Sequence, residues 1–133
     1  MMTPRLQKGL TLIELTLVIT VILVLMSISV YSTGAYTDWQ KGRAASETLR
    51  KVYVAQRLYL ADKPNTEIAN LTSDDLLPYL LDSSDEFPTI EDLDGNPLTI
   101  SVSVTPPVAL SSGGSLYDPS GSTTDSLWDI GEY

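Results

Sequence analysis

The most prominent pattern in the chain is a long apolar run near the N-terminus. Residues 10–30 contain one charged side chain, Glu14, and their other polar side chains are small hydroxyls. A helix of this length spans roughly 31 Å, which is close to the hydrocarbon thickness of a bilayer. The run is rich in β-branched residues, but in lipid only a helix satisfies its own backbone groups. We therefore predict a transmembrane helix over residues 10–31.

The helical pattern continues beyond the apolar run. No proline interrupts residues 32–61, and buried-type side chains recur at spacings of three and four from Ala45 to Tyr59. This spacing places them on one face of an amphipathic helix. Pro64 prevents further continuation. The pattern predicts a single helix over residues 10–61.

Period-two alternation marks the C-terminal part, residues 62–133. Apolar and hydroxyl side chains alternate strictly over residues 98–104, which predicts a strand with one buried face. Shorter elements follow from capping and turn signals: a helix over 73–81 capped by Thr72, a turn at 92–97, and strands at 108–110 and 115–117. The fold class expected is α+β, with the long N-terminal helix packed on a small antiparallel β-sheet head.

Composition removes several classes of function. The 17 Asp and Glu against 8 Lys and Arg give a formal net charge of −9, which argues against nucleic acid as a partner. Without His or Cys, the chain has no Ser-His-Asp or Cys-His nucleophile, no disulfide and no ordinary zinc site. Carboxylates alone could do acid–base chemistry, but none is marked out, and a head of about 70 residues has little room for a deep cleft. We expect no enzyme.

Two general explanations compete for the apolar run. A secretory signal peptide needs a shorter core and a small-residue cleavage site, and the nearest candidate, residues 32–35, is poor. An ordinary membrane anchor leaves Glu14 unexplained, because a charge in lipid costs about 2–3 kcal/mol or more. Neither explanation accounts for the whole segment.

Residues 5–15 read RLQKGLTLIEL and resemble the processing site of the type IV pilin and pseudopilin superfamily. In that pattern a short basic leader ends in Gly, and a Glu lies five residues later at the start of a long apolar helix. The resemblance implies that a prepilin peptidase removes residues 1–9, cutting between Gly9 and Leu10, and methylates the new amino group of Leu10. The family more often has Phe at that position. Many members also carry a proline about twenty residues into the mature helix, and its absence predicts an unkinked helix.

In the mature chain Glu14 would be the fifth residue, one helical turn from the amine of Leu10. A lone carboxylate in lipid is costly, whereas one paired with a neighbouring subunit's amine is much less so. We therefore predict that Glu14 drives assembly and fixes its register. Arg5 and Lys8 flank the N-terminal side, so the positive-inside rule predicts a cytoplasmic N-terminus and a periplasmic head.

The order of features in the head resembles the type II secretion major pseudopilin. A D-x-x-G-N-P turn leads to a strand, an aromatic-containing segment, a polar loop and a D-I-G ending. In that family the loop binds calcium, and by position the candidate ligands here are Asp118, Asp125 and Asp129. Asp94 replaces the usual aromatic, and the usual Gly-Asp-Gly stretch is missing. The alternative is a polar surface loop with solvated acids.

The function that this resemblance implies is a structural subunit of a type II secretion pseudopilus in the bacterial inner membrane. Its partners would be further copies of itself, minor pseudopilins, prepilin peptidase, an assembly platform in the membrane and a cytoplasmic ATPase. Two alternatives remain: a major or minor pilin of a type IV pilus, used for adhesion, motility or DNA uptake, and a monomeric membrane-anchored periplasmic binding module. The small head without Cys favours the pseudopilin.

Overall fold

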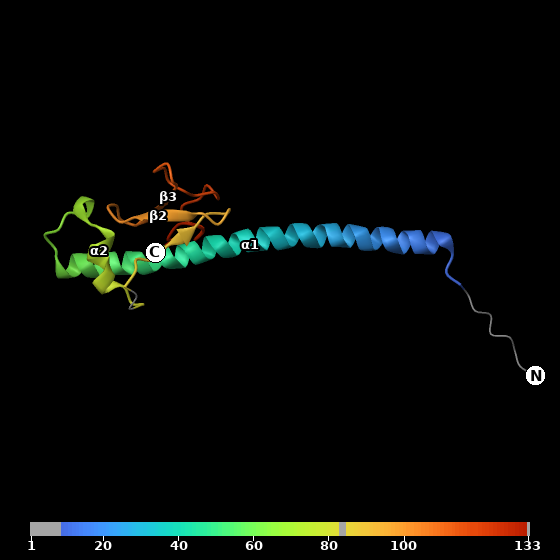
Figure 1. Cartoon of the computed structure of the whole chain (residues 1–133), viewed down its shortest axis with the longest axis horizontal. Coiled ribbons are helices and arrows are strands. Elements are labelled where there is room, and N and C mark those ends of the chain that lie inside the picture. The colour runs from blue at the N-terminus through green and yellow to red at the C-terminus, as the bar shows by residue number, and fades with distance from the viewer. Residues whose placement is uncertain (1–8, 83–84, 133) are drawn as a thin grey trace, which may run out of the picture. The chain divides into compact units, whose positions relative to one another are not determined.

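A computed structural model describes residues 9–82 and 85–132 of the chain (Figure 1). It has the expected α+β class, a long helix and a small antiparallel sheet. The elements in chain order are α1 (Leu12–Asp62), η1 (Ile68–Asn70), α2 (Ser73–Leu76), η2 (Leu77–Tyr79), β1 (Ile90–Glu91), β2 (Pro97–Ser101) and β3 (Val108–Leu110). The chain divides into two compact units, Met1–Tyr36 and Thr37–Tyr133.

The part of α1 in the first unit is apolar on all sides. Its large apolar side chains are exposed, from Leu12 at 81% to Val30 at 75%. One helix among the described residues, α1, is long and apolar enough to cross a membrane. Four hydroxyls within it donate to a backbone carbonyl three or four residues earlier: those of Thr16, Thr20, Ser27 and Ser29. No side-chain hydroxyl in this set therefore enters lipid unpaired.

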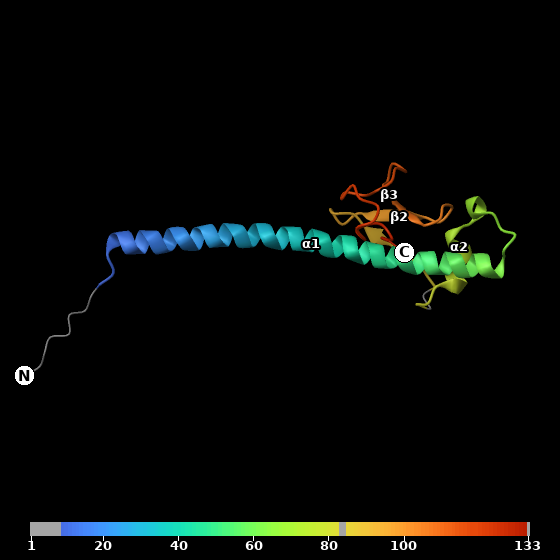
Figure 2. The ribbon, with the colours of Figure 1, turned by 180° about the vertical axis from the view of Figure 1, so that it is seen from behind.

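The second unit has its own hydrophobic core. The C-terminal part of α1 contributes a buried stripe, and the sheet and the C-terminal residues pack against it. Figure 1 and the reverse view in Figure 2 both show β2 and β3 along one side of this part of α1. The buried stripe follows the predicted spacing and consists of Ala45, Leu49, Val52, Ala55, Gln56 and Tyr59. The sequence prediction of this helical face is confirmed.

The sheet has the order β1-β2-β3 with both pairs antiparallel. The turn predicted at residues 92–97 joins β1 to β2. The Asp92 carboxylate accepts the backbone N–H groups of Asp94 at 2.9 Å and Asn96 at 2.8 Å, and Gly95 adopts φ +86°. These bonds are those of an Asx turn closed by a glycine in the left-handed region.

The strand predicted over residues 98–104 is shorter than expected. In the structure it is β2, which ends at Ser101. The buried amide of Gln56 donates to the carbonyls of Val102 and Val104, both at 2.8 Å. Beyond Ser101, the carbonyls of Val102 and Val104 therefore accept hydrogen bonds from the Gln56 side chain of α1 and not from a neighbouring strand. The strand predicted over residues 115–117 is reduced to a single bridge between Leu110 and Leu116.

The short helix predicted over residues 73–81 is present as α2 followed by η2, and it ends at Tyr79. Its predicted cap at Thr72 is also present. The Asp75 carboxylate accepts the backbone N–H of Thr72 at 3.1 Å and its hydroxyl at 2.6 Å. These bonds lower the pKa of Asp75, with the bond from the Thr72 side chain as the largest cause. The sequence did not predict β1 or η1.

Candidate functional site

The start of α1 is a capping box formed by two residues of the processing motif. The Thr11 backbone N–H donates to Glu14 Oε2 at 3.0 Å, and the Glu14 backbone N–H donates to Thr11 Oγ1 at 3.3 Å. A hydroxyl residue followed three positions later by Glu produces this reciprocal pair at helix N-termini. In a single copy of the chain, Glu14 therefore caps its own helix.

Gly9 and Leu10 lie immediately before the capping box and outside the helix. The Leu10 side chain is 78% exposed, and the space around the Gly9 Cα is open to 4 Å. The peptide bond between them is thus in non-helical backbone, the form a protease can accommodate. Arg5 and Lys8, the basic leader residues, lie outside the described residues.

The predicted metal ligands lie in the loop that follows β3. The structure places Asp125 near Asp129, since each side chain shifts the pKa of the other. Asp118 accepts the Ser120 hydroxyl at its Oδ1, at 2.7 Å. In the part of the chain that is described, no three acidic, His or Cys residues form a group that could hold a metal ion.

The paired carboxyls of Asp125 and Asp129 differ in environment. Burial raises the pKa of Asp129, and the Asp125 side chain raises it further. Burial also opposes ionisation of Asp125, but interactions with the side chains of Ser120 and Asp129 and the hydrogen bond from the Leu127 N–H together lower its pKa. Asp129 Oδ1 accepts the N–H groups of Ser126 and Gly131, while its Oδ2 is buried without a hydrogen-bond donor. A neighbouring carboxyl group disfavours ionisation of Asp129, which is one cause of its raised pKa.

The residues around Asp129 are bonded to α1. The Trp128 backbone N–H donates to the Gly42 carbonyl at 3.2 Å, and its indole N–H donates to the Glu91 carbonyl at 2.9 Å. Arg50 donates to the Ile130 carbonyl and to the Ser126 hydroxyl, both at 2.8 Å. We call residues 126–131 the docked tail. It holds the Asp129 carboxyl group in place relative to the helix.

Sequence reasoning missed the docked tail. A Cβ at Gly42 would come within 2.7 Å of the Trp128 ring, so a residue without a side chain is needed at this contact. A glycine inside a helix is a signal of close packing, because its low helix propensity otherwise destabilises the helix. Gly42 was the available clue, although nothing in the sequence identifies Trp128 as its partner.

Residues 4–30 match the family model of the prokaryotic N-terminal methylation motif. No curated protein and no solved structure matches the chain. The matched segment contains Gly9, Leu10 and Glu14 together with the apolar run. The motif and the apolar helix support a type IV pilin-like protein, anchored by a single membrane pass. The motif also implies cleavage by a prepilin peptidase and assembly into a filament at a membrane platform.

Proposed function

We propose that the chain is a structural subunit of a type II secretion pseudopilus. The observation that carries the proposal is the methylation motif placed on the apolar run of residues 10–30, in which Glu14 is the single charge. The small, cysteine-free head favours the secretion filament over an adhesive pilus. The role is mechanical, and no residue acts as a catalyst.

In this mechanism the subunit waits in the inner membrane with its N-terminus in the cytoplasm and its head in the periplasm. Removal of residues 1–9 creates an amine at Leu10. The Glu14 carboxylate of a neighbouring subunit pairs with this amine, which lowers the cost of both charges in lipid. An ATPase and a membrane platform add subunits with the aid of minor pseudopilins, and the growing filament moves exported proteins through an outer-membrane channel.

The secretion role is tested by deleting the gene in its native bacterium. We expect exported enzymes to accumulate in the periplasm while surface pili persist. Loss of pili with normal secretion would instead identify a type IV pilin. Normal secretion and normal pili would favour a monomeric binding module.

Processing gives a direct prediction at one peptide bond. We expect the mature chain to begin with N-methylated Leu10, and Gly9→Val to leave the leader attached because a side chain enters the cleavage position. Intact-mass spectrometry of the membrane-extracted protein measures both. Gly34→Ala is a matched control, since its surroundings are equally open and it lies far from the bond. A mature chain that begins at another residue would contradict the assignment.

We also propose that the loop after β3 binds calcium, as the resemblance implies. The fit rests on the Asp125–Asp129 pair and on the buried, donor-free Oδ2 of Asp129. Calcium prefers six to eight such oxygens and tolerates irregular geometry. Asp125 and Asp129 would hold the ion, and Asp118, which accepts the Ser120 hydroxyl, is the third predicted ligand. When bound, the ion would neutralise the pair and stiffen the loop.

Calcium binding predicts a thermal shift. At a hundredfold excess over Kd, calcium should stabilise the unit Thr37–Tyr133 by about 2.7 kcal/mol, and its Tm should rise by on the order of 10 °C. Calorimetry with and without calcium measures the shift, with magnesium as the control ion. Asp125→Asn should remove the shift. An unchanged Tm in excess calcium would eliminate the metal proposal and leave the filament proposal intact.

A further inference from the structure

A short uncharged segment of α1 follows its apolar run. Val30 is the last large aliphatic residue of the run, and Asp38 is the first charged residue after Glu14. The seven residues between them read YSTGAYT, and they combine two tyrosines with small residues. Seven helical residues extend for roughly 10 Å, and the headgroup layer on one side of a bilayer is about 5–8 Å thick. The segment therefore has the length and composition of the part of the anchor that crosses this layer.

The two tyrosines of this segment present their rings to the surroundings. Tyr31 is 83% exposed and Tyr36 is 58% exposed, and both belong to the first unit. A tyrosine side chain has an apolar ring and a polar hydroxyl at its tip. At a bilayer surface the ring contacts acyl chains while the hydroxyl remains among headgroups and water, which is why tyrosines are enriched there. These side chains have the chemistry that suits a lipid headgroup layer.

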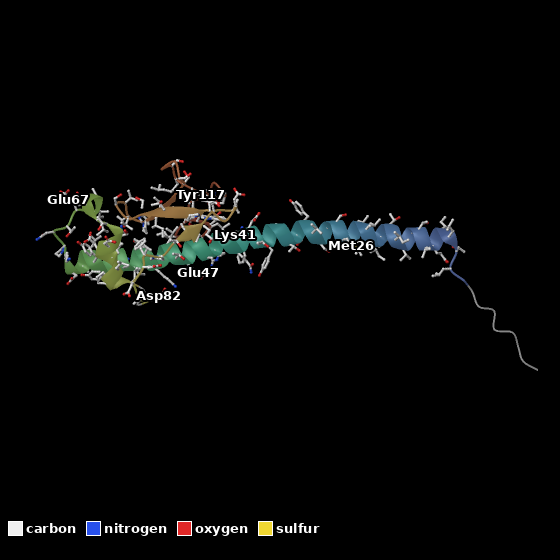
Figure 3. The ribbon with its side chains drawn as sticks, viewed as in Figure 1. Met26, Lys41, Glu47, Glu67, Asp82 and Tyr117 are labelled. Atoms are coloured by element: carbon white, nitrogen blue, oxygen red, sulfur yellow. The ribbon has the colours of Figure 1, made fainter. Side chains whose placement is uncertain are left out.

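The directions of the tyrosines favour lipid over a protein as their partner. Tyr31 and Tyr36 are five residues apart, which separates them by about 140° around the helix axis. A helix that packs on one protein surface buries a single stripe. The large apolar residues from Leu12 to Val30 are instead all exposed, and in Figure 3 the side chains near Met26 project from both edges of the α1 ribbon. Lipid surrounds a helix and contacts every side of it, as this distribution requires.

We propose that Tyr31 and Tyr36 bind the phospholipid headgroup layer and fix the depth of the anchor in the bilayer. Glu14 lies 17 residues before Tyr31, which is about 26 Å along the helix. With Tyr31 at one boundary of a hydrocarbon layer of about 30 Å, the Glu14 Cα lies about 5 Å inside the opposite boundary. The tyrosines therefore also set the depth of the Glu14 charge. The inference requires the membrane anchor alone and is independent of the kind of filament.

The depth of the anchor can be measured with single nitroxide labels on the full chain. The chain has no native cysteine, so Ser32→Cys and Val21→Cys each introduce one labelling site. The labelled proteins are placed in vesicles of phosphatidylethanolamine and phosphatidylglycerol. Paramagnetic resonance then compares the accessibility of each label to oxygen and to a water-soluble nickel complex. We expect the label at Val21 near the centre of the bilayer and the label at Ser32 in the headgroup layer.

Replacing both tyrosines tests what fixes this depth. The double variant Tyr31→Leu, Tyr36→Leu lengthens the apolar run and removes both hydroxyls, so the label at Ser32 should move into the hydrocarbon by about one helical turn, roughly 5 Å. The double variant Tyr31→Trp, Tyr36→Trp keeps side chains that prefer the interface and should leave the label at its original depth. Met26→Leu, an exposed change within the span, is the matched control and should also leave the depth unchanged.

Each outcome separates the inference from the proposed function. A label at Ser32 that keeps its depth in the leucine variant, or that moves equally in the tryptophan variant, would overturn the role of the tyrosines. A wild-type label at Ser32 found in bulk water or at the bilayer centre would do the same. A label at Val21 that is open to water would contradict the membrane anchor, and with it the filament subunit. A chain that keeps the expected depths but forms no filament in cells would refute the proposed function and support the inference.

Discussion

Replacing Glu14 with leucine should abolish filament assembly while the chain is still inserted and processed. Leucine removes the single charge of the apolar run, so the unassembled subunit becomes more stable in lipid. The assembled state loses the partner of the Leu10 amine, and breaking such a buried pair costs about 3–5 kcal/mol. We expect the sedimentable filament fraction to drop by more than about a hundredfold. Intact mass and membrane fractionation measure processing and insertion in the same cells.

The capping box supplies the control for this experiment. Thr11→Val removes the Oγ1 that accepts the Glu14 N–H, but it keeps the Glu14 carboxylate. If the carboxylate acts between subunits, Thr11→Val assembles nearly as wild type. If Glu14 serves only to start its own helix, both variants lose a similar small amount of assembly. Glu14→Leu filaments in normal yield would refute the assembly role.

Truncating Trp128 to alanine should destabilise the second unit by about 3–5 kcal/mol, a large share of a typical domain's stability. The indole is 4% exposed, contacts the Tyr117 ring edge-to-face with 5.7 Å between centroids, and donates to the Glu91 carbonyl. Its loss opens a cavity over Gly42 and releases the docked tail. Urea unfolding of the unit Thr37–Tyr133 measures the change.

Gly42→Ala tests the same contact from the helix side. In the native background its Cβ collides with the Trp128 ring, so the variant should be less stable than wild type. In the Trp128→Ala background both ring contacts are absent and the Leu127 side chain remains at 3.0 Å, so Gly42→Ala should be less destabilising than in the native background and should regain up to about 1 kcal/mol of helix propensity. A stabilising Gly42→Ala in both backgrounds would show that the tail does not pack as described.

The sequence predicts most of the helix because its signals are local. Alternating spacings of three and four mark the buried stripe of α1, and Pro64 accounts for its end near Asp62. The Thr72–Asp75 cap and the turn after Asp92 are local signals as well. The same capping rule applies to Thr11 and Glu14, but the sequence analysis interpreted Glu14 as an assembly residue and did not predict this cap.

The rest of the head depends on contacts distant in sequence. β2 stops at Ser101, where the register places Pro107, which has no N–H, opposite Val102, and the Gln56 side chain, 46 residues earlier, bonds the Val102 carbonyl. Arg50 fixes Ile130 across 80 residues. Periodicity reports which side of an element is buried, but it does not report which side chain replaces a strand partner. The geometry of the acidic loop could not be derived from spacing for the same reason.

The hydroxyls of the apolar run have a consequence for the pool of unused subunits. Four hydroxyl groups donate their hydrogen bonds to carbonyls of their own helix: those of Thr16, Thr20, Ser27 and Ser29. They therefore have no proton left to donate to a neighbouring transmembrane helix. We expect these hydroxyls to contribute little to stable pairing of unassembled anchors in the bilayer. The membrane could therefore hold many unassembled subunits. Assembly would begin when the processed N-terminus of one subunit pairs with the Glu14 carboxylate of another.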